Sequence, residues 1–466
     1  MTRGAAGVVA MLCVAAAACH RPAAHPNVVL IVLDTVRADH LSAYGYSHPT
    51  SPTLEAFARQ AIRFTQAYSL STWTLPAHAS LFTGLYPSAH GATQQHLWLD
   101  DRFDTLAELL HGRGYTTAAF SGNPWVARAT HMEQGFDVMQ EMWGRPEANE
   151  TGTFPHATNR LVFDWLARRS RDRPFFLFVN YIEPHFPYSA PATYEAPFVD
   201  PTSTADERRQ AEVRWTDWYL HPPTWTPRLA ALRAALYDAE LSYVDAILGE
   251  LLAELRRAGV YDDSIIVITS DHGENLGEHG HLDHVFSLYN TTLHVPLLLH
   301  LPQGAGAGTT RTDPVQLTDV FVTLVALTGA DPHPAPGGRN LLDGTAPPDR
   351  ALLAEYDFPA QALTAFSSAE QSSAALDGFR RELRSVQVGA RKLIWASDGR
   401  HELYDLGSDP REERNLVAEA PQSAADLNRT LQTLTQRRPP ASEPPSPALT
   451  PDAAARERLR QLGYLH

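Results

Sequence analysis

Residues 69–91, SLSTWTLPAHASLFTGLYPSAHG, predict a short helix that directly follows a strand. Thr74 is a favourable N-cap residue, and Pro76 falls in the first turn, where the missing N–H of proline costs nothing. Gly84 is expected to end the helix. Anions bind at helix N-termini, and Thr74 and His78 would share one helix face. A hydroxyl and an imidazole at such a place indicate nucleophilic chemistry on an anionic ester, and an ordinary threonine cap is the alternative.

Three apolar runs elsewhere in the chain are typical of strands buried on both faces of a parallel sheet. They are Asn27–Leu33 (NVVLIVL), residues 175–179 and Ser264–Thr269 (SIIVIT). Asp34 follows the first run and Asp271 follows the third. Open α/β sheets bind their ligands at the carboxyl ends of the strands. We therefore expect the two carboxylates to converge at one sheet edge.

The remaining pattern alternates helices with strands, which predicts an α/β fold with a mostly parallel, doubly wound sheet flanked by helices. Helices are expected over residues 52–64, 104–113, 159–169, 229–259 and 314–328, and further strands over Thr116–Ser121 and residues 295–301. Residues 190–227 show no clear period and are expected to form a long surface excursion. We assign residues 26–345 to this main domain.

The character of the sequence changes from about residue 346. Short strands are predicted at 351–355, 385–388, 392–396 and 402–404, with the hairpin signal Asp398-Gly399 between the last two. A helix is expected over residues 423–435. Residues 346–437 are thus predicted to form a small C-terminal α+β subdomain with an antiparallel sheet. Residues 438–466 are predicted to form a proline-rich linker and a terminal helix.

The overall composition is that of an ordinary globular protein, with 44% hydrophobic residues and a formal net charge of −15. The chain has no long basic run, which argues against a nucleic-acid partner. Its only two cysteines, Cys13 and Cys19, lie in the N-terminal segment. The main domain therefore has no disulfide, no thiolate metal ligand and no cysteine nucleophile, so any nucleophile must be an oxygen.

Residues 1–19 are predicted to be a signal peptide, because Arg3 precedes an apolar stretch too short to span a bilayer comfortably. The small residues before Cys19 resemble a bacterial lipoprotein box, after which this cysteine would carry the lipid. Plain secretion without a lipid is the alternative. Either reading predicts an exported protein of the bacterial periplasm or outer envelope, with membrane attachment only through such a lipid.

The residue types at the predicted sheet edge fit a metal site. Asp34, Asp271, the adjacent His272 and the Thr74 hydroxyl would offer two carboxylates, one imidazole and one alcohol oxygen. This donor set suits a borderline cation such as zinc or manganese. A cation there would lower the pKa of the hydroxyl and neutralise charge on the ester. Turn residues at strand ends are the alternative for either aspartate alone.

Three separated segments resemble the sulfatase family, within the alkaline phosphatase superfamily. TLPAHASLFTG at residues 74–84 is similar to the family signature Cys/Ser-x-Pro-x-Arg followed by Thr-Gly. SDHGENLGEHGH at residues 270–281 looks like the second metal segment, and DGRHELYDLGSDPREERNL at residues 398–416 like the C-terminal hairpin. The segments occur in the family's order over residues 27 to about 437.

The resemblance implies a role for the residue at position 74, where Thr74 stands in place of the family's Cys or Ser. Sulfatases oxidise that residue to formylglycine, and threonine cannot be converted to it. Relatives with a threonine nucleophile act on phosphate esters, as phosphodiesterases or phosphoethanolamine transferases. His78 stands where the family has Arg, which puts the formylglycine-supporting role in doubt.

The resemblance also implies a ligand set of Asp34, Thr74, Asp271 and His272. Calcium-binding sulfatases usually carry a second Asp after the first, and Thr35 stands there in this chain. The loss of that carboxylate favours zinc or manganese, with calcium as the alternative.

Other side chains are expected to contact the substrate ester. By resemblance, His185 contacts the ester or leaving group, and His284 binds the ester oxygens or protonates the leaving group. Arg37 has the right charge for a substrate oxyanion, with a surface salt bridge as its alternative, and Asn123 offers an amide to the ester. A second metal held by His281 and His284 is a further hypothesis.

The sequence thus predicts a metal-dependent hydrolase of a sulfate or phosphate ester. The Thr74 nucleophile favours phosphate mono- or diesters, whereas family resemblance alone indicates a sulfatase. The expected substrate is a small anionic ester, or a sulfated or phosphorylated glycan or lipid. The alternatives are transfer of a phospho group to an envelope acceptor and a non-catalytic relative that binds an anionic glycan.

Overall fold

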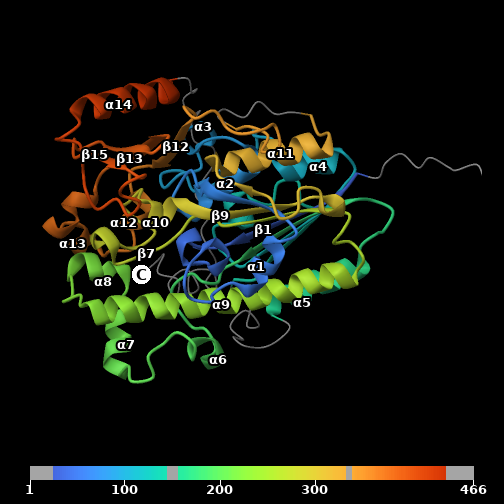
Figure 1. Ribbon diagram of the computed structural model, residues 1–466, viewed down its shortest axis with the longest axis horizontal. Helices are drawn as coiled ribbons and strands as arrows, with labels where there is room; N and C mark the ends of the chain where they lie inside the picture. Colours follow the sequence, from blue (N-terminus) through green and yellow to red (C-terminus); the bar gives the residue numbers. More distant parts are fainter. Residues whose placement is uncertain (1–24, 144–155, 332–337, 437–466) are drawn as a thin grey trace, which may run out of the picture.

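A nine-stranded sheet with helices on both faces forms the body of the protein (Figure 1). The computed structural model describes residues 25–143, 156–331 and 338–436. The strands of the large sheet are β1 (Asn27–Leu33), β2 (Ile62–Tyr68), β3 (Thr116–Ser121), β4 (Val138–Glu141), β5 (Phe175–Tyr181), β6 (Ser264–Thr269), β9 (His294–His300), β10 (Thr310–Arg311) and β11 (Val315–Gln316). Their order is β10-β2-β9-β6-β1-β5-β3-β4, and β11 also pairs with β2.

The sheet is mostly parallel, as predicted. β1 lies at its centre and pairs in parallel with β5 and β6. Among the described strands of this sheet, only β9 runs against the rest. The chain between β6 and β9 contains the short helix α10 (Asn290–Leu293) and stays at the carboxyl edge, so β9 starts where β6 ends. The predicted α/β class is confirmed, with one antiparallel strand in a mixed sheet.

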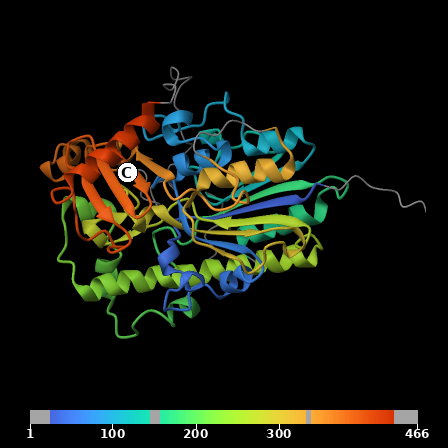
Figure 2. The ribbon, with the colours of Figure 1, turned by 45° about the horizontal axis from the view of Figure 1, so that its top comes forward.

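Strand β1 is apolar throughout because both of its faces are covered. Val28, Leu30 and Val32 face the core beneath α2 (Thr74–Thr83), α4 (Leu106–Gly112) and α11 (Leu317–Thr328). Val29, Ile31 and Leu33 face the opposite core, beneath α1 (Pro52–Ala58), α5 (Ala157–Arg168) and α9 (Pro227–Arg257). Figure 2 shows α9 running along one face of the sheet and α11 along the other.

The helix expected over residues 52–64 is wrong beyond Ala58. Helix α1 ends there, and Ile62–Tyr68 is strand β2. Ile62 and Phe64 are buried while Arg63 between them is only half-buried, which is the alternation of a strand. Pairing with β9 and β10 overrides the helical spacing. Strand β4 at the other end of the sheet was not expected at all.

The segment expected to lack periodic structure contains three short helices. They are α6 (Ala192–Glu195), α7 (Ala205–Ala211) and α8 (Trp215–Leu220). Trp215 and Trp218 are buried in a core cluster shared with the C-terminal sheet. This excursion is therefore packed onto the body of the protein rather than lying free on its surface.

The C-terminal part forms the predicted small antiparallel sheet, in the order β12 (Ala351–Tyr356), β13 (Leu383–Val388), β14 (Arg391–Ala396) and β15 (Glu402–Asp405). Helix α14 (Pro421–Gln436) covers it (Figure 1). A buried ion pair of 2.7 Å joins Lys392 to Glu412. Glu355 donates its backbone N–H to Leu70 O in the main body.

Two predicted segments lie outside the described residues. These are the signal peptide with its lipoprotein box at residues 1–19 and the proline-rich linker with its terminal helix at residues 438–466. Within the described ranges, none of the helices combines the length and the apolar character that crossing a membrane requires.

The loop that follows β1 is held by helix α9. Tyr237 Oη donates a hydrogen bond of 2.7 Å to Thr35 O and accepts one of 3.0 Å from Arg37 N. Thr35 adopts a left-handed backbone conformation with φ of 55°, which a β-branched residue rarely does. These two hydrogen bonds therefore stabilise an unfavourable turn immediately after Asp34.

We predict that Tyr237→Phe destabilises the protein, because it leaves a buried N–H and a buried C=O without their partner. The expected loss is about 2–4 kcal/mol of unfolding free energy, measured by chemical denaturation. Tyr194→Phe is the matched control: this half-buried ring packs against Tyr243, and its hydroxyl makes no hydrogen bond within the described chain. Equal stabilities of the two variants would show that Tyr237 does not hold the loop.

Candidate active site

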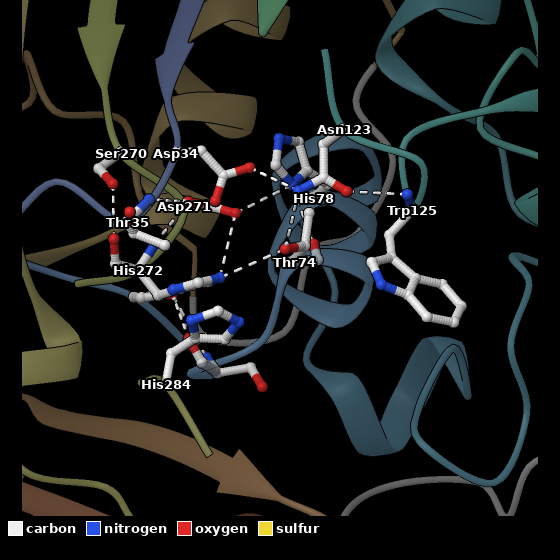
Figure 3. Close-up of polar contacts among 12 residues, drawn as sticks. Asp34, Thr35, Thr74, His78, Asn123, Trp125, Ser270, Asp271, His272 and His284 are labelled. Atoms are coloured by element: carbon white, nitrogen blue, oxygen red, sulfur yellow. Dashed lines mark hydrogen bonds and ion pairs between the residues drawn. The ribbon is translucent and has the colours of Figure 1, made fainter. Parts of the chain in front are cut away.

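The carboxyl ends of strands β1, β3 and β6 meet the N-terminus of helix α2 at one edge of the sheet. Asp34 follows β1, Asp271 lies two residues beyond β6, Asn123 lies just past β3, and Thr74 opens α2. All four side chains are completely buried. Figure 3 shows them turned toward one another. The structure thus brings together residues that lie more than two hundred positions apart in the chain.

Thr74 lies at the centre of this group. Its Oγ1 is 3.4 Å from His272 Nε2 and accepts a 3.3 Å hydrogen bond from Asn123 Nδ2. The same amide nitrogen lies 2.6 Å from Asp34 Oδ2 (Figure 3). Asn123 therefore links the threonine hydroxyl to the first aspartate, rather than standing apart from the site.

The structure corrects the role expected of Thr74 as an N-cap. Trp73 is the N-cap of α2, and Thr74 is the first helical residue. The Thr74 hydroxyl therefore does not cap the helix and instead faces His272 and Asn123. A hydroxyl at the start of a ten-residue helix lies where the free N–H groups favour an anion.

Asp271 is oriented by the backbone and by two histidines. Its Oδ1 accepts hydrogen bonds from the N–H groups of His272 (2.9 Å) and Thr35 (3.3 Å). Its Oδ2 lies 3.3 Å from His272 Nε2 and 3.5 Å from His78 Nδ1. His78 Nδ1 is also 2.9 Å from Thr74 O, so this imidazole joins the Thr74 backbone to the second aspartate.

The residues fit a divalent cation. Asp34, Asp271 and His272 each offer a buried ligand atom, and these atoms lie within 4.8 Å of one another. Asp34 Oδ1 and Asp271 Oδ2 are buried and accept no conventional hydrogen bond. Burial raises the pKa of both carboxyls, and the charge of Asp34 raises that of Asp271 further. A bound cation would compensate these two buried charges.

His272 is in the form that binds metals. Burial holds its pKa well below the usual range, so the ring is neutral. Its Nδ1 lies 3.0 Å from Gly273 O, which favours a proton on that nitrogen and a lone pair on Nε2. This lone pair belongs to the atom that faces both Thr74 and Asp271.

His284 lies next to His272, and His185 lies next to His284. The His284 ring centroid is 4.5 Å from that of His272 and 5.0 Å from that of His185. Burial lowers the pKa of His284, but the carboxylates of Asp283 and Glu274 outweigh burial and raise it well above its usual range. His284 is therefore positively charged near neutral pH, as a proton donor requires.

The partners of His284 are not those expected for a second metal. The described residues group it with Glu274 and Asp283, whose ligand atoms lie within 4.8 Å of one another and of the imidazole. His281 Nδ1 instead lies 3.0 Å from the Tyr219 hydroxyl. The structure therefore does not support the hypothesis of a cation held by His281 and His284.

Arg37 is engaged away from the group. Its guanidinium pairs with Asp39 (2.8 Å) and Glu278 (2.6 Å), and donates to Glu274 O. It lines a large separate cleft together with His294. Arg37 makes no contact with the other predicted site residues in the described structure, so the expected contact with a substrate oxyanion gains no support.

Sequence reasoning missed three buried residues near the site. Asn180, near the end of β5, accepts from Asn123 N at 3.1 Å and so orients Asn123. A signal was present, since Asn180 follows a buried apolar run as Asp34 does. Glu274 and Asp283 lie close to predicted residues, but only the folded chain shows that both face His284.

The sequence model of the family described as Sulfatase matches residues 26–330. The chain belongs to the sulfatase family. This assignment confirms the predicted family and enzyme class, a hydrolase of sulfuric or phosphoric esters. At position 74 this sulfatase-family protein has a threonine.

Relatives extend over most of the chain. An uncharacterized sulfatase, YidJ of Escherichia coli K12, is 24% identical over 431 residues, covering 84% of this chain and 83% of the relative. The crystal structure of a phosphonate monoester hydrolase of Agrobacterium radiobacter has a TM-score of 0.70 and 24% identity, covering 88% of this chain and 96% of that one. The structure of another protein, solved in complex with its substrate D-glucosamine-2-N,6-O-disulfate, has a TM-score of 0.66 and 21% identity, covering 90% of this chain and 100% of that one. The structural matches confirm the fold.

We predict that the purified protein retains about one divalent cation per chain after dialysis and that Asp271→Asn loses it, because the variant removes a buried charged ligand. Elemental analysis measures the content. Asp262→Asn, at an exposed residue nine positions before Asp271, is the surface control and is expected to keep the cation.

A second readout is the melting temperature of chelator-treated protein. Added cation should raise it in the parent chain and in Asp262→Asn but not in Asp271→Asn. Unchanged cation content in Asp271→Asn would contradict the site.

Proposed function

We propose that this protein hydrolyses a phosphate mono- or diester, with the Thr74 hydroxyl as nucleophile. The observation that carries the proposal is the position of this hydroxyl, which is buried beside Asp34, Asp271 and His272 at the start of α2. A threonine cannot become formylglycine, so the side chain must act as an alcohol. An alcohol nucleophile forms a covalent ester with the transferred group, which water then hydrolyses.

We propose that Asp34, Thr74, Asp271 and His272 hold one divalent cation, with zinc or manganese favoured over calcium. Two carboxylates and a neutral imidazole match the ligands of borderline metals better than the all-oxygen sets of calcium. When bound, the cation would lower the pKa of the threonine hydroxyl and neutralise charge on the ester.

The protein's own groups supply orientation and protons. Asn123 holds the threonine hydroxyl beside Asp34, and the N-terminus of α2 favours the anionic ester in front of it. The Thr74 hydroxyl gives up its proton to solvent, and its Oγ1 attacks phosphorus in line with the leaving alcohol, whose bond to phosphorus breaks. The charged imidazole of His284 donates the proton that the leaving oxygen takes up. His185 lies next to His284 and faces the same substrate group.

Hydrolysis of the threonine ester completes the cycle. Water attacks phosphorus and gives a proton to the now neutral imidazole. The bond between phosphorus and Thr74 Oγ1 breaks, and that oxygen takes up a proton from solvent. An alcohol in place of water would make the same protein a phospho-group transferase. Sulfate esters are the second candidate substrate, favoured by the family assignment and by a structural relative whose substrate is a sulfated sugar.

The proposed substrate is a small anionic ester, or a phosphorylated or sulfated glycan or lipid of the cell envelope. We propose that the protein is exported to the periplasm or outer envelope and anchored by a lipid on Cys19.

The nucleophile is tested with nitrophenyl phosphate, bis-nitrophenyl phosphate and nitrophenyl sulfate. We expect a phosphate ester to be the best substrate and Thr74→Ala to lower kcat on it by at least about 1,000-fold, because the covalent route is lost. Thr433→Ala makes the same change on the exposed face of α14 and should leave kcat unchanged. Best turnover of the sulfate ester, retained in Thr74→Ala, would contradict the assignment.

The anchor is tested by metabolic labelling with radioactive palmitate in a bacterial host. We expect label on the full chain and none on Cys19→Ser, since Cys19 is the residue that would be acylated. Cys13→Ser is the matched control and should keep its label. An unlabelled parent chain would leave plain secretion as the correct reading.

A further inference from the structure

Asp283 folds its carboxylate back onto the histidine that follows it. Its backbone is left-handed, with φ of 66°, and it pairs with Asn275 in the two-residue ladder between β7 (Asn275–Leu276) and β8 (Leu282–Asp283). Asn275 Nδ2 also donates to Asp283 O at 2.7 Å. Asp283 Oδ1 then accepts from the backbone N–H of His284 and lies 2.8 Å from its ring Nδ1.

Both carboxylates near His284 lie closest to the same ring nitrogen. Nδ1 lies 2.8 Å from Asp283 Oδ1 and 3.6 Å from Glu274 Oε2. Both ring nitrogens are buried, and neither makes a hydrogen bond of normal geometry among the described residues, so Nδ1 is held by its ion pair with Asp283 while Nε2 has no such pair. An imidazole that faces two carboxylates through Nδ1 carries a proton on that nitrogen. Nε2 is therefore the nitrogen left for a substrate.

A small pocket opens beside His284. Asp283 and His284 line it, and its cavity volume of about 20 Å³ has room for about one water molecule. Trp73, which immediately precedes Thr74, forms part of the same wall, and Trp215 and Ala362 complete it. The pocket thus reaches from the start of α2 to the imidazole, and none of the residues that line it carries a permanent positive charge.

We propose that Asp283 is a positioning residue that fixes the His284 ring so that Nε2 protonates the leaving alcohol; this inference rests on the proposed ester hydrolysis. As the bond between phosphorus and the leaving oxygen breaks, that oxygen keeps the bonding electrons and takes the Nε2 proton. The neutral ring keeps its Nδ1 proton, which faces Asp283. The attacking water later returns a proton to Nε2.

The same three groups could instead hold a cation. The 2.8 Å separation between Nδ1 and Oδ1 is that of a close ion pair, which favours the positioning role. The two readings differ in metal content, so the experiment measures it.

The test compares two esters of the same phosphate, one with nitrophenol and one with phenol as leaving group. Nitrophenolate leaves without a proton, whereas phenol as a leaving group needs one. For Asp283→Asn we expect kcat to fall about 100-fold on the phenyl ester and less than about threefold on the nitrophenyl ester, with KM unchanged. His284→Gln should show the same selective loss, and the double variant should lose no more than His284→Gln alone.

The other outcomes are distinguishable. An equal loss on both esters in Asp283→Asn overturns the positioning role, and so does loss of a cation from that variant. A parent chain inactive on both esters overturns the proposed function as well. Asp262→Asn, an exposed change, should match the parent chain on both esters.

A measurement on the parent chain does not depend on how the variants fold. ¹⁵N NMR of the histidine rings, with His284 assigned from the missing signal in His284→Gln, should show a protonated Nδ1. An unprotonated Nδ1 at His284 would overturn the proposal.

Discussion

The site depends on two buried carboxylates, each of which has one oxygen without a conventional hydrogen-bond partner. Asp34 and Asp271 are fully buried at neighbouring strand ends, and their charges repel each other. Burying such charges is costly unless they are paired. A bound cation would resolve the conflict, and the neutral imidazole of His272 would complete its ligand set. The surrounding loops, including the strained turn at Thr35, are organised to keep these atoms together.

The threonine at position 74 decides which chemistry this scaffold supports. Trp73, not Thr74, is the N-cap of α2. The Thr74 hydroxyl instead accepts a hydrogen bond from Asn123 next to the carboxylates. Family membership alone gives a sulfuric or phosphoric ester hydrolase. Within that class we propose an alcohol nucleophile at Thr74, with His284, whose pKa is raised by neighbouring carboxylates, as the acid.

Much of the fold followed from strand ends and periodicity. Asp34 and Asp271 were predicted together because parallel strands must end at one edge, and the structure has them there. Strand β2 was mistaken for helix because its pairing partners lie more than two hundred residues away. The role of Arg37 could not be predicted, since local charge does not reveal that Asp39 and Glu278 take up its guanidinium.

The central claim is that one cation joins Asp34, Thr74, Asp271 and His272. Anomalous diffraction from crystals of the protein, recorded on both sides of the metal absorption edge, tests it most directly. We expect a single strong peak in contact with all four side chains. A peak at Glu274, Asp283 and His284 alone, or a cation at the first group that leaves the Thr74 oxygen out of its coordination, would contradict the account.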